Sequence, residues 1–169
     1  DALHNFLKRG GRMVFLMEPD TPDTFKRLLR KWGVILEDKY VLDRASFVSP
    51  NPATPLLSQS NGNYPFSFIP ELTGVLDRTF YPGVTGIVPV DEILEDDNST
   101  IGFLPLALTS PASWLVDSPE IEPAEDTEAA GPQLVATALV ATAPLGEQAS
   151  STESDAPLTA ARIVVFGDS

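Results

Sequence analysis

Three short polar segments each follow an apolar run that is typical of a β-strand. They are Glu18-Pro19-Asp20, Thr109-Ser110 with Trp114 close behind, and Gly167-Asp168-Ser169. Ligands of open parallel sheets collect outside the carboxyl ends of the strands, where such segments meet. If the three strands are parallel neighbours, their carboxylates, hydroxyls and aromatic ring would share one crevice, which suits a neutral polar ligand such as a sugar. The candidate ligand-binding residues are therefore Glu18, Asp20, Ser110, Trp114, Asp168 and Ser169.

The same residues also have a purely structural interpretation. Asp and Ser are ordinary turn and cap residues, and Trp114 would then be a packed lid residue rather than a platform on which a sugar ring stacks. The sequence leaves both interpretations open.

Groups that could perform catalysis are scarce. The chain has no cysteine and one histidine, His4, which lies on a predicted helix away from any Ser or Asp pattern. A cysteine nucleophile is therefore excluded, and a Ser-His-Asp triad cannot be assembled from these residues. Gly10-Gly11 precedes a strand instead of joining a strand to a helix, so it cannot present a helix N-terminus to a phosphate. The sequence predicts a non-enzymatic protein without a bound cofactor.

Two acidic segments deserve comparison with metal sites. The turn from Asp91 to Asp97 lacks the Asp-x-Asx-x-Asx-Gly spacing of a calcium loop. The run from Glu120 to Glu128 has no fixed turn chemistry either, which favours a hydrated loop over a weak divalent-cation site. We therefore predict no metal centre.

Charge is distributed unevenly along the 169 residues. Residues 1–44 hold nine of the eleven basic residues and seven acidic ones, a net charge of +2, and residues 45–169 carry −15, which together give −13. So acidic a chain repels nucleic acid and anionic lipid. The basic cluster at helical spacing, which is either a solvated helix face or a docking patch, consists of Lys26, Arg27, Arg30 and Lys31.

The first 44 residues predict alternating helices and strands. Apolar residues recur at helical spacing after Asp1 until Gly10-Gly11, and the unbroken apolar run 13–17 predicts a central strand covered on both faces. A second helix, capped by Asp20 or Thr21, ends at Gly33, and its expected buried stripe is Phe25, Leu28, Leu29 and Trp32. Two short extended segments, 34–36 and 40–42, follow. This order predicts a three-layer α/β domain with a largely parallel sheet.

The remainder is interpreted more coarsely. We expect irregular or mobile loops near 45–66, 117–132 and 144–157, because prolines, serines or acidic residues dominate there. No core is expected in the first of these loops. A short helix is expected over residues 72–80, and the predicted strands are 84–90, 103–108, 133–142 and 162–166. The whole chain, 1–169, is predicted to be a single domain.

Several motifs occur in an order that resembles a known family. The first is Leu3-x-x-Phe6-Leu7-x-x-Gly10-Gly11-Arg12-x-Val14-x-x-x-x-Glu18-Pro19, followed by Leu28-Leu29-x-x-Trp32-Gly33-Val34 and Val41-x-Asp43. Later blocks are Phe80-Tyr81-Pro82-Gly83-Val84, Leu106-Ala107-Leu108-Thr109-Ser110 with Trp114, and Arg162-Ile163-Val164-Val165-Phe166-Gly167-Asp168-Ser169. The series resembles the auxiliary domain of ABC-type transport systems, the group that includes the gliding-motility auxiliary component and GldG-like proteins. One departure is Ser67-Phe68-Ile69-Pro70, where such domains often show His-Pro-Ile.

The resemblance implies a flavodoxin-like or glutamine-amidotransferase-like fold without the catalytic cysteine. It also implies an extracytoplasmic accessory domain, a scaffold or ligand-contact module, that works with an ABC permease and ATPase and contacts cell-surface polysaccharide. The resemblance further implies a protein anchored by transmembrane helices that lie outside this chain. Because Asp1 is not an initiator methionine and no signal segment follows it, we expect the chain to be part of a longer protein. The alternative hypothesis is a carbohydrate-binding module with its site at the carboxyl ends of the strands.

Overall fold

The structure, a computed structural model, describes residues 2–65, 77–90, 100–121, 123, 127–142 and 160–168. Two helices and ten strands occur in these residues. In chain order they are α1 (Ala2–Lys8), β1 (Arg12–Leu16), α2 (Asp23–Lys31), β2 (Val34–Asp43), β3 (Phe47–Val48), β4 (Asn51–Ser58), β5 (Arg78–Phe80), β6 (Thr85–Pro89), β7 (Ile101–Leu108), β8 (Ser113–Val116), β9 (Leu134–Ala141) and β10 (Ala161–Phe166).

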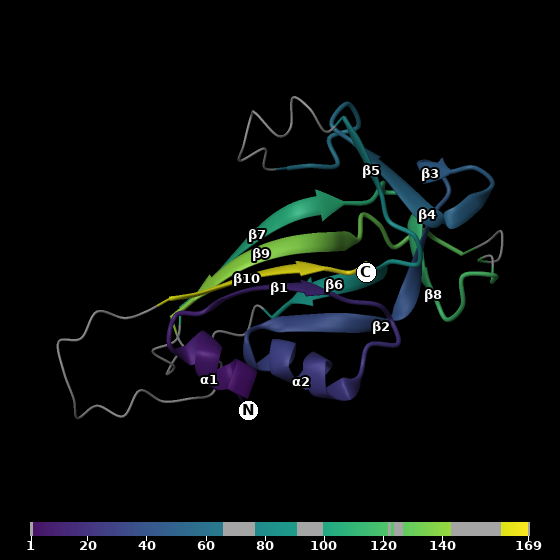
Figure 1. The fold of residues 1–169 in the computed structure, drawn as a ribbon. Coiled ribbons are helices and arrows are strands. Elements are labelled where there is room, and N and C mark those ends of the chain that lie inside the picture. The colour runs from purple at the N-terminus through teal and green to yellow at the C-terminus, as the bar shows by residue number, and fades with distance from the viewer. Residues whose placement is uncertain are drawn as a thin grey trace.

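The strands form three small sheets. The largest, which we call the main sheet, has the order β1-β10-β9-β7, and the other two have the orders β6-β2-β8 and β3-β4-β5. Within the main sheet β1 and β10 are parallel, whereas β9 is antiparallel to both β10 and β7. Figure 1 shows both helices on the β1 side of the molecule, away from β7.

The predicted three-layer α/β fold with a largely parallel sheet is wrong. Of the described residues 47% lie in strands and 13% in helices, and the sheets are mixed or antiparallel. Parallel strands need long crossovers that carry helices over the faces of the sheet. The two helices of the described chain pack on one side of the main sheet only. The flavodoxin-like and glutamine-amidotransferase-like architectures are overturned with this expectation.

The apolar run 13–17 also lies elsewhere than predicted. It forms β1, which is an edge strand of the main sheet. Phe15 and Met17 point into the core, but Val14 and Leu16 are 63% and 58% exposed. An unbroken apolar run is compatible with a strand that is buried on both faces. The run by itself does not determine whether a second layer covers the strand.

The helices follow the predicted pattern with differences at their ends. The N-cap of α2 is Pro22, not Asp20 or Thr21 as predicted, and no side chain caps the helix. The Thr21 hydroxyl accepts a hydrogen bond from the Glu18 N–H at 2.8 Å. Trp32 and Leu29 are buried, whereas Phe25 is exposed. The helix ends as predicted at Gly33, whose φ of 81° is a left-handed conformation that favours glycine.

Residues 34–43 form one strand where two short segments were predicted. The first half of β2 pairs with β6 and its second half pairs with β8, with a register shift between Leu36 and Tyr40. Residues 34–36 therefore pair with β6, whereas Tyr40 pairs with both β6 and β8. Asp43 ends this strand.

Part of the loop expected near 45–66 forms strands, and the prediction that it holds no core is wrong. It contains β3 and the eight-residue β4, and both Ala53 and Leu57 are buried. Prolines are tolerated in β4 because the strand contributes carbonyl groups here. The N–H groups of Gly83 and Tyr81 donate to the carbonyls of Ala53 and Pro55 at 2.9 and 3.0 Å.

The later elements agree with the sequence more closely. The strands predicted at 84–90, 103–108, 133–142 and 162–166 are confirmed as β6, β7, β9 and β10. Phe80 belongs to β5 rather than to a helix, and residues 72–76 lie outside the described part. Near 117–132 the described residues form no helix or strand, and the acidic turn 91–99 and the expected loop 144–157 are not among the described residues.

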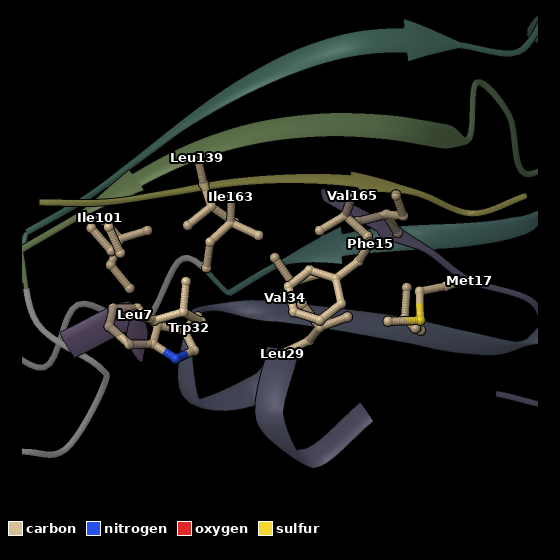
Figure 2. Close-up of a cluster of buried hydrophobic side chains, with 14 residues drawn as sticks. Leu7, Phe15, Met17, Leu29, Trp32, Val34, Ile101, Leu139, Ile163 and Val165 are labelled. Carbon is tan, nitrogen blue, oxygen red and sulfur yellow. The ribbon is translucent and has the colours of Figure 1, made fainter. Parts of the chain in front are cut away.

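The largest core lies between the inner face of the main sheet and the layer formed by α1, α2, β2 and β6. Figure 2 shows Trp32, Leu29 and Val34 facing Ile163, Val165 and Leu139 across this core. Burying such side chains stabilises the fold by roughly 1.5–3 kcal/mol each. Neither α1 nor α2, the helices of the described chain, has the length and hydropathy that a membrane crossing requires.

Candidate functional site

The three polar segments that follow β1, β7 and β10 lie at the same end of the main sheet, where these strands finish. Because β9 is antiparallel to β7 and β10, and β1 is parallel to β10, the strands β1, β7 and β10 run in the same direction. However, the order β1-β10-β9-β7 places three strand spacings, about 14 Å, between β1 and β7. The three segments therefore lie at the same end of the sheet, but the segment after β1 is too far from the segment after β7 for direct contact.

The segment after β1 is held as a turn. Besides the bond from the Glu18 N–H to Thr21, Lys26 donates to the Pro19 carbonyl at 2.6 Å and forms an ion pair with Asp38. These contacts attach the turn to α2 and β2. Glu18 and Asp20 are exposed.

The segment after β7 is built on Asp43, a fully buried carboxylate at the end of β2. Oδ1 of Asp43 accepts hydrogen bonds from the N–H groups of Ala45 and Ser46 at 2.9 and 3.0 Å and from the Ser110 hydroxyl at 2.6 Å. Oδ2 accepts the Ser110 N–H at 2.8 Å. A buried charge is tolerated when it is hydrogen-bonded in this way. The carboxylate is thus committed to holding the chain.

A second set of hydrogen bonds extends this arrangement toward β9. Thr109 and Ser113 share a hydroxyl contact of 2.8 Å, and the Gln133 N–H donates to the Thr109 hydroxyl at 2.8 Å. Gly131 passes so close that a Cβ atom there would lie 2.2 Å from Ser113 Oγ and 2.5 Å from the Ser110 carbonyl oxygen. The loop before β9 is therefore packed directly on the exit of β7.

A cavity of about 440 Å³ opens above this exit. Its polar lining comes from Ser46, Asn61, Asn63, Thr109 and Ser110, and Pro111 and Pro132 form part of its wall. Asn63 is fixed, because its side chain donates to the Leu108 carbonyl at 2.9 Å and accepts from the Ser58 N–H at 3.0 Å. Of the candidate residues, Ser110 lines this cavity, whereas Glu18, Asp20, Trp114 and Asp168 do not.

Trp114 anchors the polypeptide that follows β8. Its indole Nε1 donates to the Thr127 carbonyl at 3.1 Å, and the Arg44 guanidinium lies 5.2 Å from the ring centroid. Arg44 also donates to the Pro123 carbonyl at 3.0 Å. Both side chains therefore hold segments of the region 117–132.

Asp168, after β10, lies near a group of hydroxyl side chains. Burial raises the pKa of the Tyr81 phenol above its ordinary value, a hydrogen bond with Thr79 lowers it, and the neighbouring Tyr64 and Asp168 raise it further. Tyr64 also donates to the Leu57 carbonyl at 3.1 Å. Ser169 lies outside the described residues.

The described residues contain no cluster of three His, Asp or Glu side chains that could hold a metal ion. His4 lies on α1, with its ring 5.8 Å from that of Trp32, and so belongs to the helix layer rather than to the Ser110 cavity. Asp43, the residue that organises the β7 exit, was not among the predicted site residues. Its position at the end of an apolar strand was a visible pattern, but its partner Ser110 is 67 residues away.

Exposed apolar side chains gather around β1. Val14 and Leu16 of β1 are accompanied by Leu3 and Phe6 of α1 and by Phe25 of α2. A groove of about 350 Å³ runs along β1 beneath Leu3, Pro22 and Phe25. A second groove of about 510 Å³ lies between the helices and is lined by His4, Arg27, Leu28 and Lys31. We call these residues and the two grooves the β1 surface.

No family model matches the chain. No curated protein matches it either. Among solved structures, the chain is similar to the mmIFT52 N-terminal domain, with a TM-score of 0.56 and 12% sequence identity, over 98% of this chain and 57% of that one. The chain thus spans little more than half the length of that structure, and at this identity the similarity concerns the fold alone.

Proposed function

We propose that this chain is a non-catalytic docking domain that serves as an accessory to an ABC-type transport system. The observation that carries the docking role is the β1 surface, where large apolar side chains are exposed next to an edge strand. Soluble domains rarely expose contiguous apolar patches, and such patches commonly mark interaction sites. The transport assignment is supported by the ordered motifs that resemble the auxiliary domains of such systems.

The arrangement at the β7 exit supports a role without catalysis. Asp43 and Ser110, the best-organised acid and hydroxyl pair of the described residues, are engaged with each other and with the backbone. A general base must reach a substrate proton, and a buried carboxylate with four donors is not available for that step. This geometry is suited to stabilising the fold rather than to moving a proton.

Site-specific photo-crosslinking in the full-length gene product tests the docking role. A benzophenone amino acid at Val14 is expected to capture a permease or ATPase subunit in native membranes, identified by mass spectrometry. The matched control is Phe80, which is also 63% exposed but lies on β5. Capture of the same proteins from both positions, or of no transporter subunit from Val14, contradicts the proposal.

The proposed location is outside the cytoplasmic membrane, on a membrane-anchored protein. The chain contains no cysteine, so a Val88→Cys substitution on the exposed side of β6 gives this domain a single thiol. A maleimide that cannot cross membranes should label that thiol in intact cells. Labelling that requires cell lysis contradicts the extracytoplasmic location.

A second candidate function is carbohydrate binding, which the cavity at Ser110 favours. Its lining offers hydroxyl and amide groups of the type that recognise neutral polar ligands. Calorimetry with purified glycans should give binding that Asn61→Ala weakens and Asp20→Ala, which lies outside the cavity, leaves unchanged. If the wild-type protein ignores every glycan, or if both variants lose binding equally, the carbohydrate function is excluded.

A further inference from the structure

The backbone of β1 presents hydrogen-bonding groups toward its free edge. On the β10 side, the Met17 N–H donates to the Phe166 carbonyl at 2.9 Å, and the Gly11 carbonyl accepts from the Arg162 N–H at 3.1 Å. Backbone groups of successive residues in a strand point to opposite sides. The N–H and C=O groups of Arg12, Val14 and Leu16 therefore point away from β10. Within the described residues β1 has a strand partner on that one side only.

The groove along β1 provides space for the side chains of an added strand. It lies between the free edge and the residues Leu3, Pro22 and Phe25, and has a volume of about 350 Å³. Alternate side chains of a neighbouring strand would point into this groove, and the others would lie over the opposite face, beside Val14 and Leu16. The apolar lining of the groove favours apolar residues among the partner side chains that point into it.

The charge around β1 determines which residues are favoured in the second set of partner side chains, those beside Val14 and Leu16. Arg12, at the start of the strand, lies on the same face as Val14 and Leu16, and Arg162, its partner in register on β10, is also exposed. The β1 strand belongs to the basic part of the chain, because residues 1–44 have a net charge of +2 while the rest carry −15. A ligand complementary to this surface is therefore apolar on one face and acidic on the other.

From these features we infer that β1 accepts an extended acidic peptide segment of a partner protein, which adds to the main sheet as a fifth strand. This inference rests on the proposed docking function and specifies its binding mode. Main-chain hydrogen bonds provide affinity in such strand addition, and alternate side chains provide specificity. A second copy of the chain is disfavoured as the occupant, because each copy carries −13 and would bring another basic β1 surface against the first.

Fluorescence anisotropy with synthetic peptides of about eight residues tests the inference. The probe alternates valine and glutamate, and the control alternates valine and lysine. At low salt we expect the glutamate peptide to bind at least about tenfold more tightly, a preference that salt weakens. Arg12→Glu should remove the preference, and the matched variant Arg78→Glu, on β5, should retain it. Equal binding of the two peptides overturns the inference.

Backbone pairing is tested without altering the protein. N-methylation of one alternate set of peptide amides should weaken binding about tenfold or more, whereas methylation of the other set should have little effect. Peptide binding should also slow hydrogen exchange at the N–H groups of Val14 and Leu16. Insensitivity to methylation, or protection confined to other strands, overturns strand addition.

Two further outcomes are distinguishable. Concentration-dependent dimerisation that Val14→Pro abolishes, measured by sedimentation, identifies a second copy as the occupant and overturns the inference. If the peptides fail but a crosslinker at Val14 captures a transporter subunit, the docking function stands and the strand-addition mode fails. Because Val14 N–H is not bonded to β10, proline at this edge position leaves the β1–β10 ladder in place.

Discussion

Ser110 makes two hydrogen bonds to Asp43, one from its hydroxyl at 2.6 Å and one from its backbone N–H at 2.8 Å, and these bonds join the exit of β7 to the end of β2. The carboxylate is fully buried. It also fixes the turn that follows β2, because Ala45 and Ser46 donate to it as well. Ser110, one of the candidate ligand-binding residues, therefore also joins two parts of the fold, and it lines a cavity.

Replacing Asp43 should destabilise the protein strongly. Asp43→Asn puts an amide donor where the carboxylate accepts the Ser110 N–H, so we expect a loss of about 2–4 kcal/mol in the free energy of unfolding. Urea denaturation measures this loss. The control is Asp117→Asn, whose side chain is 81% exposed and which should cost less than about 1 kcal/mol. Equal effects of the two substitutions would show that the junction contributes little.

Gly167 should not tolerate a side chain. Its N–H donates to the Val135 carbonyl, its carbonyl accepts the Thr85 N–H at 2.7 Å, and a Cβ atom would lie 2.2 Å from the Thr85 carbonyl oxygen. Because that obstacle is backbone, Gly167→Ala should cost about 1–3 kcal/mol or more. Gly102→Ala is the matched control, since nothing lies within 4 Å of a Cβ atom there. Thermal unfolding of both variants compares them, and similar midpoints would refute the close approach.

Alkaline pH should weaken the protein through Tyr81. Burial, opposed by the Thr79 hydrogen bond and assisted by Tyr64 and Asp168, raises its pKa above the ordinary value near 10. The stabilisation from the protonated phenol is therefore complete below pH 10 and is lost as the pH rises through the folded-state pKa. Stability measured from pH 9 upward should fall more steeply for the wild type than for Tyr81→Phe. Parallel curves would contradict the raised pKa.

Trp114 should act on the loop after β8 rather than on a ligand. Trp114→Phe retains an aromatic ring but removes the donor to the Thr127 carbonyl, at a cost of about 0.5–1.5 kcal/mol. Hydrogen exchange of residues 127–131 should become faster, while exchange in β10 stays the same. If glycan binding were lost with no change in exchange, Trp114 would instead be a ligand contact.

Local patterns in the sequence were sufficient for several elements. The helix stripe of Leu29 and Trp32 and the stop at Gly33 were predicted, because helix periodicity and the left-handed end depend on neighbouring residues. Strands β9 and β10 were also predicted, because their apolar runs are likewise patterns of neighbouring residues. In contrast, β4 was missed because its prolines suggested a loop, whereas Tyr81 and Gly83, distant in sequence, donate to its carbonyl groups.

The sequence by itself determined which segments form helices and most strands, where the basic residues lie, and that the chain has no cysteine. Tertiary structure alone decided the direction of β9, the edge position of β1 and the pairing of Asp43 with Ser110. The physical reason is that side chains alternate in the same way in parallel and antiparallel strands. Burial of a carboxylate likewise depends on donors that come from a distant part of the chain.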